Sequence, residues 1–67
     1  MYETGELVFV KRLGGVRPIE QIFKLYIYEK NQTIFKIGSF NLYEKNIRKA
    51  TTNEIKKYKL ENMFKSN

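Results

Sequence analysis

The segment at residues 21–40, QIFKLYIYEKNQTIFKIGSF, constrains the fold of this chain more than any other stretch. Two runs rich in β-branched and aromatic residues flank a polar centre, KNQ at residues 30–32, which is the pattern of a β-hairpin. A three-residue loop at that centre sets the pairing of the two strands: Ile27 lies opposite Phe35, and Leu25 lies opposite Ile37. The sequence therefore predicts a long hairpin as the main structural element.

Alternation of side chains along each strand divides this predicted hairpin into two faces. One face is wholly apolar and is predicted to be the core: Phe23, Leu25, Ile27, Phe35 and Ile37. The other face mixes aromatic, apolar and basic residues: Lys24, Tyr26, Tyr28, Ile34 and Lys36. Exposed rings can stack on bases while lysines neutralise phosphates, so this second face is the best candidate for binding nucleic acid. It becomes core instead if the C-terminal helix or a second protomer covers it.

Shorter elements are expected on both sides of the hairpin. GELVFVKR at residues 5–12 is typical of a strand that is covered on both faces. The adjacent glycines and the proline of residues 13–21, LGGVRPIEQ, predict an irregular loop. Gly38 is expected to end the regular pairing or to mark a bulge, and residues 41–50 offer anchors for short edge strands: Leu42, Tyr43 and Ile47.

A helix is predicted to start within residues 48–58, RKATTNEIKKY. Thr51 is a good N-cap, and Glu54 stands three residues later, where it completes a capping box. Ile55, Tyr58, Met63 and Leu60 supply an imperfect apolar face for this helix. The last residues, 65–67, are expected to fray.

These elements predict one small domain over residues 1–67, mainly β with one C-terminal α-helix, in which about five short strands form a small SH3-like barrel. ETGELVFVKR at residues 3–12 resembles the first strand of SH3-like or KOW-like barrels. IRKATTNEIKKY at residues 47–58 resembles the Arg-x-Ala-Thr-Pro-Glu-Glu-Ile closing segment of many small phage and mobile-element proteins of low-GC Gram-positive bacteria, although Thr52 replaces the Pro and Asn53 the first Glu. The resemblance implies a fold and a genetic setting rather than a chemistry.

The residue types on which most catalytic sites depend are missing from the sequence. There is no His and no Cys, which removes the commonest general base and leaves only oxygen ligands for a metal. The seven acidic residues are all Glu and are scattered along the chain. We therefore expect no enzyme activity, no cofactor and no metal. No apolar run approaches the roughly 20 residues of a membrane span, and no signal-peptide pattern is present, so a cytoplasmic protein is expected.

Basic residues exceed acidic ones by six, and residues 41–67 hold seven basic residues against three acidic ones. Such an excess is expected of nucleic-acid binders, but it also serves solubility. Five basic residues outside the hairpin join the candidate surface: Arg12, Arg17, Arg48, Lys49 and Lys56. The first two flank adjacent glycines that either hold a phosphate or simply turn. The last three belong, together with Lys45, Lys57 and Lys59, either to one basic rim or to a solvated helix face.

Three hypotheses for the function follow from these features. The leading one is a non-enzymatic basic module that binds DNA or RNA through the mixed face of the hairpin. The second is a phage or mobile-element inhibitor or adaptor that docks on a host protein, such as a defence nuclease, with the tyrosines as hot spots. The third is a structural homodimer, which follows if the mixed face is self-complementary.

Overall fold

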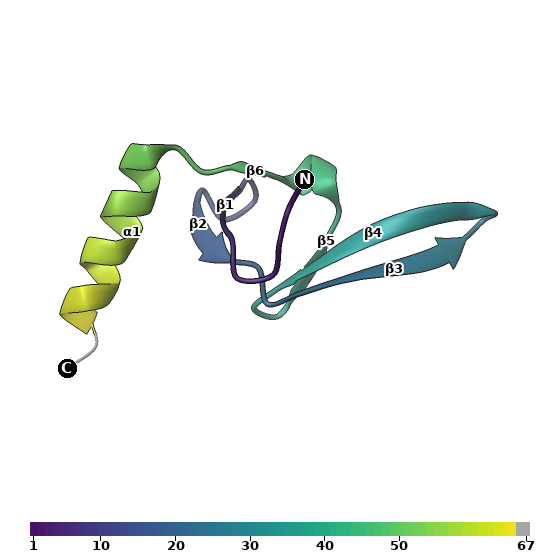
Figure 1. Ribbon diagram of the computed structural model, residues 1–67, viewed down its shortest axis with the longest axis horizontal. Coiled ribbons are helices and arrows are strands. Elements are labelled where there is room, and N and C mark those ends of the chain that lie inside the picture. The colour runs from purple at the N-terminus through teal and green to yellow at the C-terminus, as the bar shows by residue number, and fades with distance from the viewer. Residues whose placement is uncertain (66–67) are drawn as a thin grey trace.

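The computed structural model describes residues 1–65 and shows a mainly β protein with one C-terminal helix, which confirms the predicted fold class (Figure 1). Six strands, a short 3-10 helix and one α-helix follow in the order β1 (Leu7–Val10), β2 (Gly15–Pro18), β3 (Gln21–Ile27), β4 (Lys30–Ile37), β5 (Phe40–Leu42), η1 (Glu44–Asn46), β6 (Ile47–Lys49) and α1 (Thr52–Lys65). The frayed tail expected over residues 65–67 lies outside the described residues, except that Lys65 ends α1.

β2 is a strand that the sequence does not predict, and it lies inside the predicted irregular loop. Gly14 makes the turn after β1 with a φ of 66°, and its N–H donates to the carbonyl of Val10 over 2.9 Å. The turn brings the next residues back alongside β1, where Val16 is buried opposite Phe9. Pro18 is tolerated because β2 is an edge strand, so its missing N–H breaks no ladder.

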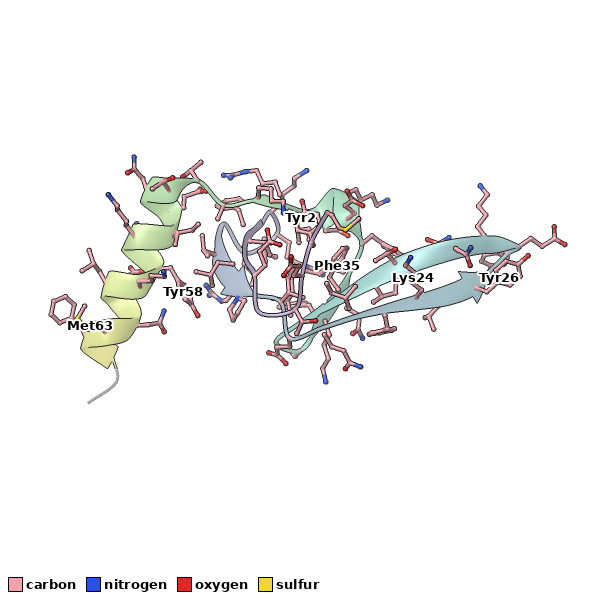
Figure 2. The ribbon with its side chains drawn as sticks, viewed as in Figure 1. Tyr2, Lys24, Tyr26, Phe35, Tyr58 and Met63 are labelled. Atoms are coloured by element: carbon pink, nitrogen blue, oxygen red, sulfur yellow. The ribbon has the colours of Figure 1, made fainter. Side chains whose placement is uncertain are left out.

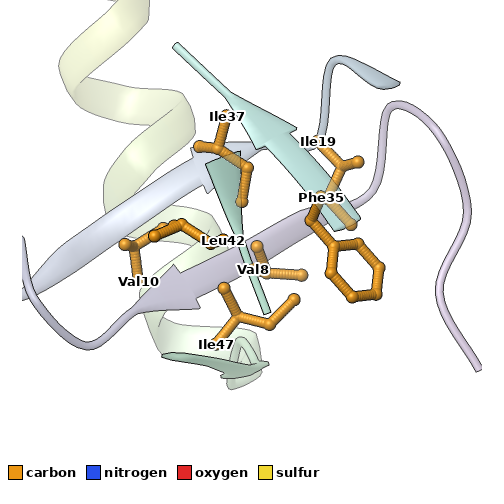
Figure 3. Close-up of a cluster of buried hydrophobic side chains, with 7 residues drawn as sticks. All are labelled: Val8, Val10, Ile19, Phe35, Ile37, Leu42 and Ile47. Atoms are coloured by element: carbon orange, nitrogen blue, oxygen red, sulfur yellow. The ribbon is translucent and has the colours of Figure 1, made fainter. Parts of the chain in front are cut away.

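Two three-stranded antiparallel sheets, ordered β2–β1–β6 and β3–β4–β5, enclose a small apolar core. Its buried members come from both sheets and from the link between β2 and β3: Val8, Val10, Ile19, Phe35, Ile37, Leu42 and Ile47 (Figure 3). Tyr2 packs its ring edge-on against Phe35, with 5.3 Å between the ring centres. Within residues 1–65 the two sheets remain separate ladders, so the predicted barrel is not closed.

The register predicted for the hairpin is wrong. β3 and β4 are joined by a two-residue turn, Tyr28-Glu29, with φ angles of 52° and 59°, and the ladder runs from Ile27 opposite Lys30 to Gln21 opposite Lys36. Positive φ at both positions is what a two-residue hairpin turn of type I′ requires. The polar KNQ segment that was expected to be the loop begins β4 instead.

This register changes which residues of β3 face the core. Phe35 and Ile37 of β4 are buried as predicted, but their neighbour on the same face of β3 is Ile22. Phe23, Leu25 and Ile27, predicted to be core, lie on the outer face of the sheet, because opposite residues in an antiparallel pair share a face.

The hairpin and α1 project from opposite ends of the molecule, which measures 45 × 22 × 19 Å (Figure 1). The capping box at the start of α1 is confirmed: the Glu54 N–H donates to Thr51 Oγ1 over 3.2 Å, and the Thr51 N–H donates to Glu54 Oε1 over 2.8 Å. The helix does not cover the hairpin tyrosines, and Leu60 and Met63 remain 52% and 62% exposed. No helix among the described residues is both long and apolar enough to span a bilayer.

Candidate functional site

The outer half of the hairpin extends beyond the rest of the β structure. β5 pairs only with the end of β4, from Phe35 opposite Leu42 to Ile37 opposite Phe40. Residues 24–33, here called the hairpin arm, therefore form a two-stranded ribbon that starts at Lys24 opposite Thr33 and ends at the turn. Figure 1 shows this ribbon reaching away from the core.

Large side chains stand exposed on the hairpin arm. Tyr26 is 70% exposed, Tyr28 at the turn is 91% exposed, and Leu25 is 43% exposed. Lys24 and Tyr26 share one side of the ribbon with Thr33 and Asn31, because these residues pair across the strands (Figure 2). The structure thus brings together three of the predicted site residues, Lys24, Tyr26 and Tyr28.

Two residues predicted on the same face do not lie there. Ile34 is opposite Phe23 and Lys36 is opposite Gln21, which places both on the other side of the hairpin. Ile34 is also only 7% exposed, so it offers no contact surface to a partner. The error follows directly from the register, because a shift by an odd number of residues moves one strand's side chains to the opposite face.

The hairpin arm carries two lysines and one glutamate. Neither Lys24 nor Lys30 takes part in an ion pair within residues 1–65. Lys30 is not among the predicted site residues, since the sequence predicts it in the loop. In the structure it closes the ladder opposite Ile27, beside the exposed turn. Glu29 occupies the second turn position, so the net formal charge of the arm is +1.

Arg48 forms an ion pair and a ring contact within the fold. Its guanidinium donates to both carboxylate oxygens of Glu54, each over 2.9 Å, and lies 4.0 Å from the centre of the Phe9 ring. The hydrogen bonds from Arg48, with a further one from the Thr51 N–H, lower the pKa of Glu54 to about 2. The same pairing raises the pKa of Arg48. This side chain joins β6 to the first turn of α1.

Lys49 has a similar structural role at the N-terminal segment. Its ammonium donates to Glu6 over 2.6 Å and to the carbonyl of Met1 over 2.5 Å, and it lies 4.4 Å from the centre of the Tyr2 ring. The hydrogen bond from Lys49 is the main reason that the pKa of Glu6 is lowered. Each of these two ion pairs joins one basic and one acidic side chain, so together they leave the excess of six basic residues unchanged.

Arg12 and Arg17 lie on the body of the molecule, away from the arm. The Arg12 guanidinium lies 5.2 Å from the centre of the Phe40 ring, and Arg17 donates to the carbonyl of Val16 over 2.7 Å. Arg17 and Phe40 also line a cleft of about 260 Å³. Phe40 pairs with the last residue of β4, so at about 3.3 Å per residue this region is roughly 20 Å along the strand from the turn.

Lys56 stands exposed on α1, at the end of the molecule opposite to the hairpin arm. Four other residues of this helix line a cleft of about 300 Å³ against β1 and β2: Glu54, Lys57, Tyr58 and Glu61. The predicted basic rim is therefore not uniform. Arg48 and Lys49 are held in ion pairs, whereas the other members are exposed: Lys45, Lys56, Lys57 and Lys59.

Comparisons of the chain with protein-family models, with curated proteins and with solved structures found no match.

Proposed function

We propose that this protein is a non-enzymatic module that binds nucleic acid, preferably single-stranded, through the hairpin arm. The two tyrosines of the arm supply stacking surfaces, and Lys24 and Lys30 neutralise neighbouring phosphates. Other basic side chains that stand in no ion pair within residues 1–65, such as Arg12, Arg17 and Lys56, add electrostatic attraction over longer distances.

The observation that carries this proposal is the exposure of Tyr26 and Tyr28, at 70% and 91%, on a ribbon with two lysines that form no ion pair in the described chain. A chain of 67 residues has little apolar surface to spare for its core, so large exposed rings favour a use outside it. Rings that protrude in this way can be reached by unstacked bases, which favours single strands over a duplex.

The test is fluorescence anisotropy with labelled single-stranded DNA, RNA and duplex DNA, over a salt series from about 50 to 200 mM. We expect binding that weakens linearly on a plot of log affinity against log salt, and that is tighter for single strands than for the duplex. Tyr26→Ala should weaken binding roughly tenfold, because stacking on an aromatic ring contributes about 1–3 kcal/mol per base.

A matched pair of charge variants locates the contact. Lys24→Gln and Lys56→Gln remove the same charge from opposite ends of the molecule. We expect Lys24→Gln to reduce the slope of the salt dependence by about one unit, and Lys56→Gln to change it less. Equal effects would mean that attraction is spread over the whole surface. No binding of the unaltered protein at the lowest salt would refute the proposal.

A host protein is the second candidate partner, because the net charge of the arm is only +1. Tyrosine is enriched at protein hot spots, so the same rings would anchor an inhibitor or adaptor on a host nucleic-acid enzyme. In that case Tyr26→Ala would abolish a stable complex with the host protein, while nucleic acid would bind weakly at physiological salt. The proposed setting for either role is the cytoplasm of a low-GC Gram-positive bacterium that carries a phage or mobile element.

A further inference from the structure

β3 is a long edge strand with no protection against pairing. It lies at the outside of the β3–β4–β5 sheet, and its seven residues include no Pro and no Gly. Natural edge strands are usually kept short, or blocked by Pro, by several charges or by a bulge. Lys24 is the only charged residue of β3, so the strand is open to a further strand.

The register identifies the backbone groups that this edge offers. The Glu20 N–H donates to the carbonyl of Lys36 over 2.8 Å, so the polar groups of Lys36 face β3. Gln21 lies opposite Lys36, so its backbone N–H and C=O groups face β4. Because the direction of these groups alternates along a strand, the same holds for every second residue of β3 after it: Phe23, Leu25 and Ile27. The N–H and C=O groups of Ile22, Lys24 and Tyr26 therefore point to the open edge.

We propose that a second copy of this chain occupies this edge, so that two β3 strands pair antiparallel about a twofold axis at Leu25. Lys24 then forms a hydrogen-bonded pair with Tyr26 of the second copy, and both residues direct their backbone groups to the edge, as this pairing requires. Leu25 lies opposite its own copy, and Phe23 lies opposite Ile27 of the second copy. The pairing joins the two sheets into one sheet of six strands.

Charge selects this register over its nearest rival. An axis at Lys24 would place the two Lys24 side chains directly opposite each other, and like charges at such positions are destabilising. An axis at Leu25 instead pairs each lysine with a tyrosine and gathers Phe23, Leu25 and Ile27 of both copies on one face. This arrangement covers Leu25, which is 43% exposed in the single chain. It does not depend on nucleic-acid binding.

The absence of cysteine from the chain allows a direct test of the register. In the dimer of Leu25→Cys, the Cα atoms of the two cysteines lie about 4.5 Å apart, which is within the range for a disulfide. In Lys24→Cys, the two cysteines are offset by two residues, at about 7–8 Å, which is too far. Mild oxidation should therefore cross-link Leu25→Cys rapidly and Lys24→Cys slowly. The reverse order of rates would overturn the register.

The dimer itself is tested by sedimentation equilibrium of the unaltered chain without nucleic acid over a dilution series. We expect a monomer–dimer equilibrium. Leu25→Glu sets two carboxylates against each other at the axis, so it should give a monomer. The control Gln32→Glu adds the same charge on the neighbouring strand β4, where it should leave the dimer in place. A chain that is monomeric at every concentration, or a Leu25→Glu variant that is still dimeric and folded, would overturn the proposal.

Discussion

The base of the hairpin and its arm are parts of the same two strands, yet their side chains meet different surroundings. At the base, Phe35 and Ile37 are 2% and 1% exposed because the β2–β1–β6 sheet packs over them. In the arm the same alternation of side chains continues, but Tyr26 is 70% exposed. A strand pattern therefore states which side chains share a face, whereas the extent of the second layer decides where the core ends.

The largest expected effect separates these two regions by stability. Phe35→Ala should lower the free energy of unfolding by about 3–5 kcal/mol, because it leaves a cavity in the core and removes the ring that Tyr2 packs against. Tyr26→Ala should change the same quantity by no more than about 0.5 kcal/mol, because its side chain is largely in solvent. Urea denaturation followed by circular dichroism measures both. Comparable losses would show that the arm is packed in solution and would remove the contrast.

Features that depend on neighbouring residues could be predicted from the sequence, and the capping box is the clearest case. Thr51 and Glu54 satisfy each other's backbone groups within one turn, so no distant part of the chain is needed to define the start of α1. The hairpin itself was predicted for the same reason, since its two apolar runs are adjacent. Its register was not, because it depends on packing against the distant β2–β1–β6 sheet, which buries Phe35 and Ile37 and partly covers Ile22.

The candidate site was predictable to the same limited degree. Lys24 and Tyr26 share a face in any register, since they are two residues apart on one strand. Ile34 and Lys36 were added to them by a pairing that does not form. The pairing of Lys49 with Glu6 spans 43 positions, so no local pattern indicated that this lysine is held within the fold. The hairpin arm also could not be recognised, because its exposure depends on how short β5 is.

A smaller effect is expected at the turn, which should control the arm but not the base. Tyr28 and Glu29 both have positive φ, a conformation that costs L-residues roughly 1–2 kcal/mol and glycine very little. Glu29→Gly should therefore raise the free energy of unfolding by up to about 1 kcal/mol, after the greater flexibility of glycine in the unfolded chain is allowed for. Glu29→Ala removes the same carboxylate without this relief and serves as the control.

Hydrogen exchange shows whether this gain is confined to the arm. In Glu29→Gly, amides of the ladder next to the turn should exchange more slowly, while amides at the base should change only with global stability. Equal slowing at both ends would mean that the hairpin opens as one cooperative unit, and the distinction between arm and base would then hold for side chains alone.

The smallest expected effect concerns acid, which should act on α1 and leave the hairpin arm unaffected. The pKa of Glu54 is about 2 in the folded chain against an ordinary value of 4.5, chiefly because Arg48 donates to its carboxylate. Because the pKa of Glu54 is lower in the folded chain than in the unfolded chain, its charged carboxylate stabilises the fold at pH values above about 4.5. This contribution is lost as the pH falls from about 4.5 to about 2. The start of α1 should therefore loosen from β6 within that window.

Amide exchange measured at a series of pH values, corrected for the intrinsic rate, tests this expectation. Between pH 4.5 and 2 the first turn of α1 should lose protection before the base of the hairpin does, because the base rests on apolar burial that does not titrate. Glu54→Gln should abolish the pH dependence at α1, whereas Glu61→Gln, on the same helix, should preserve it. If both variants behaved alike, the helix would be held by its contacts with β2 rather than by Arg48, and its attachment would resemble that of the hairpin base.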